Sequence, residues 1–145
     1  EGSVNAIFYE NQVIFSNGTQ IFAFSTTATP QQMWATQLPS LNGVYDAFSL
    51  TASATACGGF VYFPMLVQTV RDGSYYQLTG IDAKTGGMQT QTRIHEVVKG
   101  EYAFNSLQAP SCVSGNNVAI AYFEGQKWPQ SDRHGQYTIY GVTRD

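Results

Sequence analysis

"TGIDAKTGG", residues 79–87, carries the clearest structural signal in the chain. Its first four residues are the end of an aromatic, strand-like run, SYYQLTGID (residues 74–82), and its last two are glycines. An aspartate at the start of such a segment stabilises a turn, because its side chain accepts hydrogen bonds from the backbone just beyond it. The stretch therefore predicts that a strand ends near Asp82 and that a tight turn leads into the next strand.

Short apolar strands separated by turn residues extend outward from this stretch in both directions. FVYFPMLVQ is separated from SYYQLTGID by Asp72-Gly73, and Asn17-Gly18 lies between QVIFS and TQIFAFS. Such dipeptides between apolar runs are a strong hairpin signal. Only RIHEVVKGEYAF approaches helical periodicity, and Gly100 with the adjacent valine pair weakens it. The sequence predicts an all-β chain that forms a single domain over residues 1–145.

An internal repeat organises these strands. GVYDAFSLTA and GEYAFNSLQA match at one offset of 57 positions, with the identities Gly43/Gly100, Tyr45/Tyr102, Ser49/Ser106, Leu50/Leu107 and Ala52/Ala109. Further along, Gly80-Ile81 matches Gly141-Val142 after a longer loop, and Cys57 matches Cys112 after a two-residue deletion. The first 40 residues fit as a shorter copy, and the repeat predicts approximate units over residues 3–41, 42–98 and 99–145.

The segment VIFSNGTQIFAFSTTATPQQMWATQLP is similar to the repeat of quinoprotein-like (PQQ-type) β-propellers. Asn17-Gly18 and Trp34 hold the family's turn and tryptophan positions in the first unit, and IDAKTG (residues 81–86) matches the family's turn in the second. The second unit departs from the pattern, with Gln89 or Thr90 where a tryptophan is expected. The resemblance implies a propeller-like array of about three four-stranded antiparallel blades, with IDAKTG between the third and fourth strands of its blade.

The third unit supplies no fourth strand, which predicts an incomplete last blade. Only EGSV precedes the first strand, and three blades fall short of the four to eight that close a propeller. We therefore expect a partner chain, or a longer polypeptide of which this is a piece, to cover the open edge over Gln136 to Asp145. The alternative fold is a β-sandwich or barrel of about ten strands built from a duplicated unit.

Composition excludes some classes of partner. The 145 residues include only seven Lys and Arg, without a basic cluster, so we expect no nucleic-acid binding. No apolar run approaches the ~18 residues of a membrane helix, so we expect no membrane span. Low charge, two cysteines and the sequon Asn17-Gly18-Thr19 favour an extracellular, secreted protein with a glycan on Asn17.

Catalytic motifs are missing from the sequence. It contains no G-x-S-x-G, H-E-x-x-H, C-x-x-C or phosphate-binding glycine loop, which predicts that the chain is not an enzyme. His95 and His134 fall in presumed loops far apart in the chain and are interpreted as surface histidines. Quinone-dependent enzymes of the resembled family are much longer and have an adjacent cysteine pair that this chain lacks, so we expect no cofactor and no metal.

In a propeller blade, the loops between strands two and three and between blades open on one face. Those loops are expected to be long here, over Pro64 to Arg71, Gly125 to Gly135, Asn42 to Phe48 and Glu96 to Phe104. Binding residues concentrate on such loops. The predicted contacts are Trp128, Arg71, Lys127, Arg133 and His134. Trp128, beside Pro129 in a polar segment, would suit either a protein partner or a sugar ring.

The resemblance also places Cys57 and Cys112 near the ends of neighbouring inner strands, which converge on the propeller axis. This predicts a disulfide between them, the alternative being two buried thiols that pack as small apolar residues. The function predicted first is an extracellular structural or protein-interaction module that assembles with other chains through open β-edges. The alternatives are a lectin-like carbohydrate-binding domain and a fragment of a larger quinoprotein-like enzyme.

Overall fold

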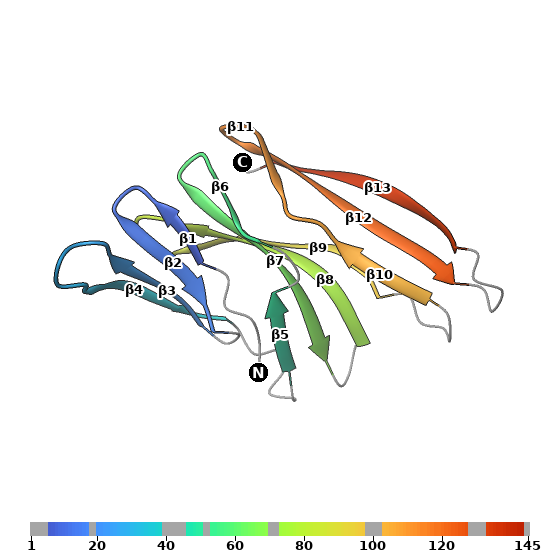
Figure 1. The fold of residues 1–145 in the computed structure, drawn as a ribbon, viewed down its shortest axis with the longest axis horizontal. Coiled ribbons are helices and arrows are strands. Elements are labelled where there is room, and N and C mark those ends of the chain that lie inside the picture. The colour runs from blue at the N-terminus through green and yellow to red at the C-terminus, as the bar shows by residue number, and fades with distance from the viewer. Residues whose placement is uncertain are drawn as a thin grey trace.

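The computed structural model describes residues 6–17, 20–38, 46–50, 53–69, 73–97, 103–127 and 133–143. For residues 46–50, 69, 103–104, 126–127 and 133–135 it describes the backbone alone. Within these ranges the chain has thirteen strands and no helix, and every strand pairing is antiparallel. The all-β prediction is confirmed. Figure 1 shows three sheets arranged side by side like an open fan.

Sheet 1 is a meander in which each strand pairs with the next. Its strands are β1 (Ala6–Tyr9), β2 (Gln12–Ser16), β3 (Gln20–Ser25) and β4 (Gln32–Gln37). The hairpin predicted between β2 and β3 is present, and the backbone N–H of Gln20 donates to Oδ1 of Asn17 at 2.9 Å.

Sheet 2 lies at the centre of the fan (Figure 1). Its strands are β5 (Asp46–Leu50), β6 (Thr55–Cys57), β7 (Phe60–Thr69), β8 (Gly73–Asp82) and β9 (Met88–Glu96). β5 and β6 pair with successive halves of the same edge of β7, so together they fill one strand position. The sheet therefore has four positions, and the turn that contains Asp82 joins the third to the fourth, as predicted.

Sheet 3 repeats this plan without a fourth position among the described residues. Its strands are β10 (Ala103–Leu107), β11 (Ser111–Ser114), β12 (Asn117–Lys127) and β13 (Arg133–Thr143). β10 and β11 again share one edge, and Pro110, which has no N–H for a strand ladder, lies between them. The positions number four, four and three as expected, and these two split strands explain why thirteen strands are present instead of eleven.

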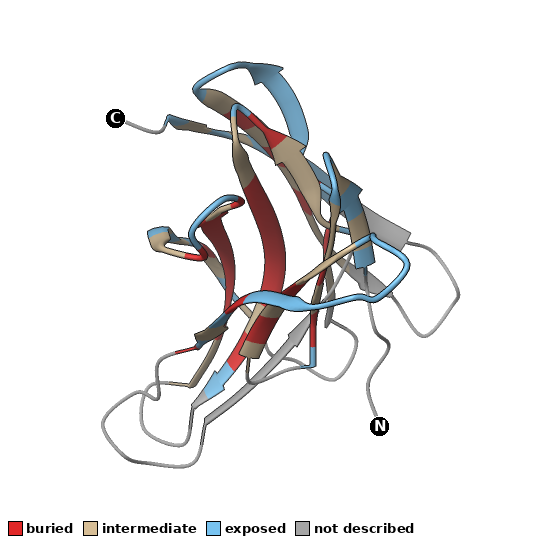
Figure 2. Ribbon diagram, turned by 90° about the vertical axis from the view of Figure 1, so that its left-hand side faces the viewer, coloured by how far each residue is buried: buried red, intermediate tan, exposed pale blue. Residues whose placement is uncertain are grey.

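Two hydrophobic cores join the three sheets. The first combines Ile14, Ile21 and Ala23 of sheet 1 with residues of sheet 2, among them Val61, Phe63, Met65 and Ile81. The second combines Tyr62, Tyr76 and Leu78 of sheet 2 with Val118, Ile120 and Tyr122 of sheet 3. Successive residues of a strand point to opposite faces, so sheet 2 is buried on both sides. Figure 2 shows the buried residues gathered on strands in the middle of the molecule.

The cross-strand register defines equivalent positions in the sheets. Val61 pairs with Ile81 in sheet 2, and Val118 pairs with Val142 in sheet 3. We call the face of sheet 2 that contains Val61, Phe63 and Ile81 its leading face, and the opposite one, with Tyr62, Tyr76 and Leu78, its trailing face. Equivalent residues define the same two faces in sheets 1 and 3.

The first strands of the sheets lie together, since β6 contacts both β1 and β11. The predicted disulfide is confirmed: Cys57 of β6 is bonded to Cys112 of β11, with Cα atoms 5.3 Å apart. The two cysteines are not equivalent in register. Cys57 lies opposite Phe60, whereas Cys112 lies opposite Val118, whose counterpart Val61 pairs with Ala56. A register shift in β11 accompanies this offset, so the bond joins staggered positions of neighbouring strands.

Several segments expected to be loops are strands. β7 continues to Thr69, β12 continues to Lys127, and β13 begins at Arg133. His95 and His134 likewise lie in β9 and β13, and Arg93 to Glu96, part of the weakly helical stretch, belongs to β9. The polar composition of these segments suggested loops, but strands with one solvated face also alternate apolar with polar residues.

Candidate interaction surfaces

Two of the five predicted contact residues, Trp128 and Arg71, lie outside the described residues. The other three lie at the end of the β12–β13 hairpin where residues 128–132 connect the two strands; there Lys127 pairs with Arg133 and Gln126 with His134. The structure thus places these three backbone positions together on sheet 3, at the end of a long hairpin. Asn17, the predicted glycan site, is exposed, and its glycosylation remains a prediction.

The IDAKTG turn forms a docking point for sheet 1. Oδ1 of Asp82 accepts the backbone N–H groups of Lys84 at 2.8 Å and Thr85 at 3.1 Å, as expected. Trp34 Nε1 of β4 donates to the carbonyl of Ala83 at 3.0 Å. Gly86 has φ 78°, and a Cβ there would lie 2.6 Å from the Trp34 ring. Sequence reasoning identified Trp34 and the turn separately but not their contact.

A cavity of about 320 Å³ lies beside this turn. It is bounded by Tyr9 and Glu10, by Gly58 to Phe60, and by Asp82 to Lys84. Gln12 Nε2 donates to the carbonyl of Ala83 at 2.8 Å, and the N–H of Ala83 donates to the carbonyl of Gly59 at 3.0 Å. The first of these hydrogen bonds joins sheet 1 to sheet 2 and the second lies within sheet 2, so the cavity belongs to the junction of the two sheets.

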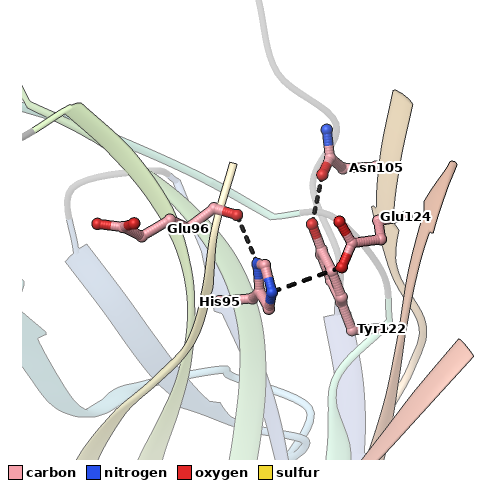
Figure 3. A network of polar contacts seen from close by, with 5 residues as sticks. All are labelled: His95, Glu96, Asn105, Tyr122 and Glu124. Carbon is pink, nitrogen blue, oxygen red and sulfur yellow. Dashed lines mark hydrogen bonds and ion pairs between the residues drawn. The ribbon is translucent and has the colours of Figure 1, made fainter. Parts of the chain in front are cut away.

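Sheets 2 and 3 are joined by a polar network (Figure 3). The His95 ring stacks on Tyr122, with centroids 4.4 Å apart, and its Nε2 lies 3.6 Å from Oε1 of Glu124. Nδ1 of His95 lies 2.7 Å from the carbonyl oxygen of Glu96. Tyr122 donates a hydrogen bond to Oδ1 of Asn105. His95 is therefore partly enclosed at an interface, which corrects its interpretation as a solvated loop residue.

Burial dominates the ionisation of Tyr122. Its side chain is fully enclosed, and this enclosure, together with Glu124, Tyr76 and Tyr140, raises its pKa from 10.0 to about 12. The phenol is therefore neutral at physiological pH and can donate to Asn105. The contacts of His95 with Tyr122 and Glu124 connect sheet 2 to sheet 3. Within the described residues no cluster of three or more His, Cys, Asp or Glu could hold a metal ion.

The leading face of sheet 1 is apolar and solvent-facing. Phe15 and Phe22 have ring centroids 5.5 Å apart, and Phe15 and Phe24 are separated by 5.9 Å. Phe8, paired with Val13 on the same face, is 76% exposed. No described residue of another sheet packs against this face.

The trailing face of sheet 3 is the second apolar surface. Tyr137 and Ile139 are 64% and 67% exposed, and Ile139 pairs with Ala121 on the same face. Tyr137 also packs against Phe123, at 4.7 Å between ring centroids. In the described part of the chain, the outer edge of β13 has no strand beside it, although β8 at the equivalent position pairs with β9.

The sequence contained a signal for these surfaces. In β2 and β3 both alternating sets of residues are apolar, with Ile14, Ile21 and Ala23 on one face and phenylalanines on the other. Strands that are apolar on both faces are typical of sheets covered on both sides.

Comparisons of the chain with protein-family models, with curated proteins and with solved structures gave no match. The surfaces therefore have to be interpreted from their own geometry. Among the described residues, none belongs to a helix of the length and apolarity that crossing a membrane requires.

Proposed function

We propose that this chain is an extracellular structural or protein-interaction module that assembles with other chains. Its three sheets act as propeller-like blades, and other protein covers the outer edge of β13 and the apolar faces at the two ends of the stack. The disulfide between Cys57 and Cys112 supports an oxidising compartment, since such bonds persist chiefly outside the cytosol.

One observation carries this proposal. Tyr76 and Leu78 of sheet 2 are 7% and 0% exposed, because sheet 3 covers them. Their register equivalents in sheet 3, Tyr137 and Ile139, are 64% and 67% exposed. The residue types are the same or nearly so. Tyr76 and Leu78 have sheet 3 over them and β9 beside them, whereas no described residue takes either place for Tyr137 and Ile139. Extended apolar surface of this kind marks interaction sites in soluble proteins.

The open edge of β13 supports the same conclusion. β13 has eleven residues, all paired with β12 on one side. A long strand with one unpaired edge invites the addition of a further strand, in which main-chain hydrogen bonds supply the affinity.

Amide hydrogen exchange on native particles tests this proposal. We expect protection of the amides of Gln136 to Thr143 that point away from β12, because a partner strand holds them. β12 provides the internal control, since it is paired on both sides in the isolated chain and should exchange slowly in either case. Rapid exchange of every outward amide of β13 in native particles would refute the proposal.

A further inference from the structure

The two uncovered faces of the stack are of opposite type. Inside the chain, the trailing face of sheet 1 packs on the leading face of sheet 2, and the trailing face of sheet 2 packs on the leading face of sheet 3. Among the described residues, sheet 1 leaves its leading face uncovered and sheet 3 leaves its trailing face uncovered. Trailing face packs on leading face twice within the chain, and the two uncovered faces are one further face of each type. They are therefore complementary in the same way as the faces that already pack together.

Equivalent residues on the leading faces support this complementarity. By register, Val13 and Phe15 of sheet 1 correspond to Val61 and Phe63 of sheet 2, which are both 0% exposed. Phe8 corresponds to Ala56, which packs in the interface between sheets 1 and 2.

By register, Lys127 and Arg133 share the trailing face of sheet 3, at the end of the β12–β13 hairpin beyond Gly125 and Gly135. The described side chains over the rest of the two uncovered faces carry no charge. On sheet 1 the apolar positions are Phe8, Val13, Phe15, Phe22 and Phe24, and on sheet 3 they are Ala119, Ala121, Tyr137 and Ile139. These apolar parts of the two surfaces can therefore pack together without burying an unpaired ion, which would be costly.

We propose that the partner is a second copy of this chain, stacked head to tail. The trailing face of sheet 3 in one copy packs on the leading face of sheet 1 in the other, which continues the internal stacking. This inference rests on the proposed function and names the partner that covers the two apolar faces, while the strand that covers the outer edge of β13 is left unassigned. Two copies contribute six sheets, which lies within the four to eight that close a propeller ring. A head-to-tail contact makes a ring when it closes and a fibre when it does not. Closure with six sheets requires two copies, so the particle is a dimer.

Native mass spectrometry of the purified chain tests the inference, with one substitution on each face. The wild-type chain is expected at twice its 15.9 kDa. Phe8→Glu and Ile139→Lys each place a charge at a position that is exposed in the single chain, so each should fold normally and remain monomeric. Thr29→Lys, in the exposed β3–β4 connection, is the matched control and should dimerise like the wild type.

Mixing the two monomeric variants distinguishes head-to-tail stacking from other dimers. The Phe8→Glu chain keeps an intact trailing face, and the Ile139→Lys chain keeps an intact leading face. Together they form one wild-type interface and one that pairs Glu with Lys, so a heterodimer should appear. A dimer that uses the same face of both copies would not be restored in this way.

Three results would overturn the inference: a wild-type chain that remains monomeric at micromolar concentration, wild-type dimers that both variants retain, or mixed variants that stay monomeric. Exchange measurements separate this failure from that of the proposed function. If native particles protect the β13 edge but contain a different protein, the second-copy inference fails and the proposed function stands. If the chain is monomeric with an unprotected edge, both fail.

Discussion

Sheets 2 and 3 share a topology and a cross-strand register over their first three strand positions, yet their exposure differs sharply. Leu78 and Ile139 occupy equivalent positions, one of them fully enclosed and the other 67% exposed. Gly80 and Gly141 differ through their own sheets: a Cβ on Gly80 would approach Thr90 of β9 and Tyr62 of β7, whereas none of the described atoms lies within 4 Å of one on Gly141. The first three strand positions of the two sheets are built alike, and the environment of their residues is set by the covering sheet and by the fourth strand, both of which only sheet 2 has among the described residues.

The largest expected effect concerns the covalent link between these two sheets. Replacing Cys57 and Cys112 together by alanine opens a loop with a sequence separation of 55. The chain-entropy model predicts a loss of about 4 kcal/mol in unfolding free energy, measured by urea denaturation. Mass spectrometry of freshly isolated, non-reduced wild-type protein is the control, and two alkylatable thiols there would contradict the bond.

A pair of core truncations tests the difference in cover directly. Leu78→Ala removes a fully buried side chain and should cost roughly 2–5 kcal/mol of unfolding free energy. Ile139→Ala, measured in dilute protein where copies separate, should cost less than about 0.5 kcal/mol, because its side chain is largely solvated. Similar losses at the two positions would show that sheet 3 is covered within the single chain.

Replacing Gly80 or Gly141 by alanine adds a methyl group, whereas the truncations above remove side-chain atoms, and the expected effect is smaller. Gly80→Ala places a methyl group 2.5 Å from Thr90 Oγ1 and 2.9 Å from the Tyr62 ring, so we expect a loss of roughly 1–3 kcal/mol. Gly141→Ala meets open space and should be neutral within about 0.5 kcal/mol. Thermal unfolding of the two variants measures the difference, and a strongly destabilising Gly141→Ala would contradict the open trailing face.

The smallest effect appears only at high pH, at the interface between sheets 2 and 3. Burial raises the pKa of Tyr122 to about 12, so folding favours its protonated form. The stability from this group is fully present below pH 10.0 and is lost as pH rises through about 12. Tyr122→Phe should flatten this part of the pH–stability curve. If the pH–stability curve of Tyr122→Phe is the same as that of the wild type, groups other than Tyr122 cause the loss of stability at high pH.

The strand arrangement could be predicted from the sequence because its signals are local. Alternating apolar residues, the turn at Asp82 and the match of Gly80-Ile81 with Gly141-Val142 indicated four, four and three strand positions. Hairpin length was predicted poorly, since the polar ends of β12 and β13 resemble a loop in composition. The split of the first strands in sheets 2 and 3 was also missed.

Contacts between the sheets were largely beyond sequence reasoning. The packing of Trp34 on Gly86 and of His95 on Tyr122 joins residues that are distant in the chain, and it depends on how the sheets stack. The Cys57–Cys112 bond was predicted because the repeat resemblance placed both residues on converging strands. The role of all five predicted contact residues stays a prediction, and two of them, Trp128 and Arg71, lie outside the described residues.

The most direct test of the account is the solvent accessibility of Tyr137 relative to Tyr76. Hydroxyl-radical footprinting should be carried out on native particles and on dilute single chains, with Tyr76 as the buried reference. The account predicts that Tyr137 reacts readily in the dilute chain and becomes protected in the particle, to a level like that of Tyr76. Equal, high reactivity of Tyr137 in both samples would contradict the claim that the trailing face of sheet 3 is an assembly surface.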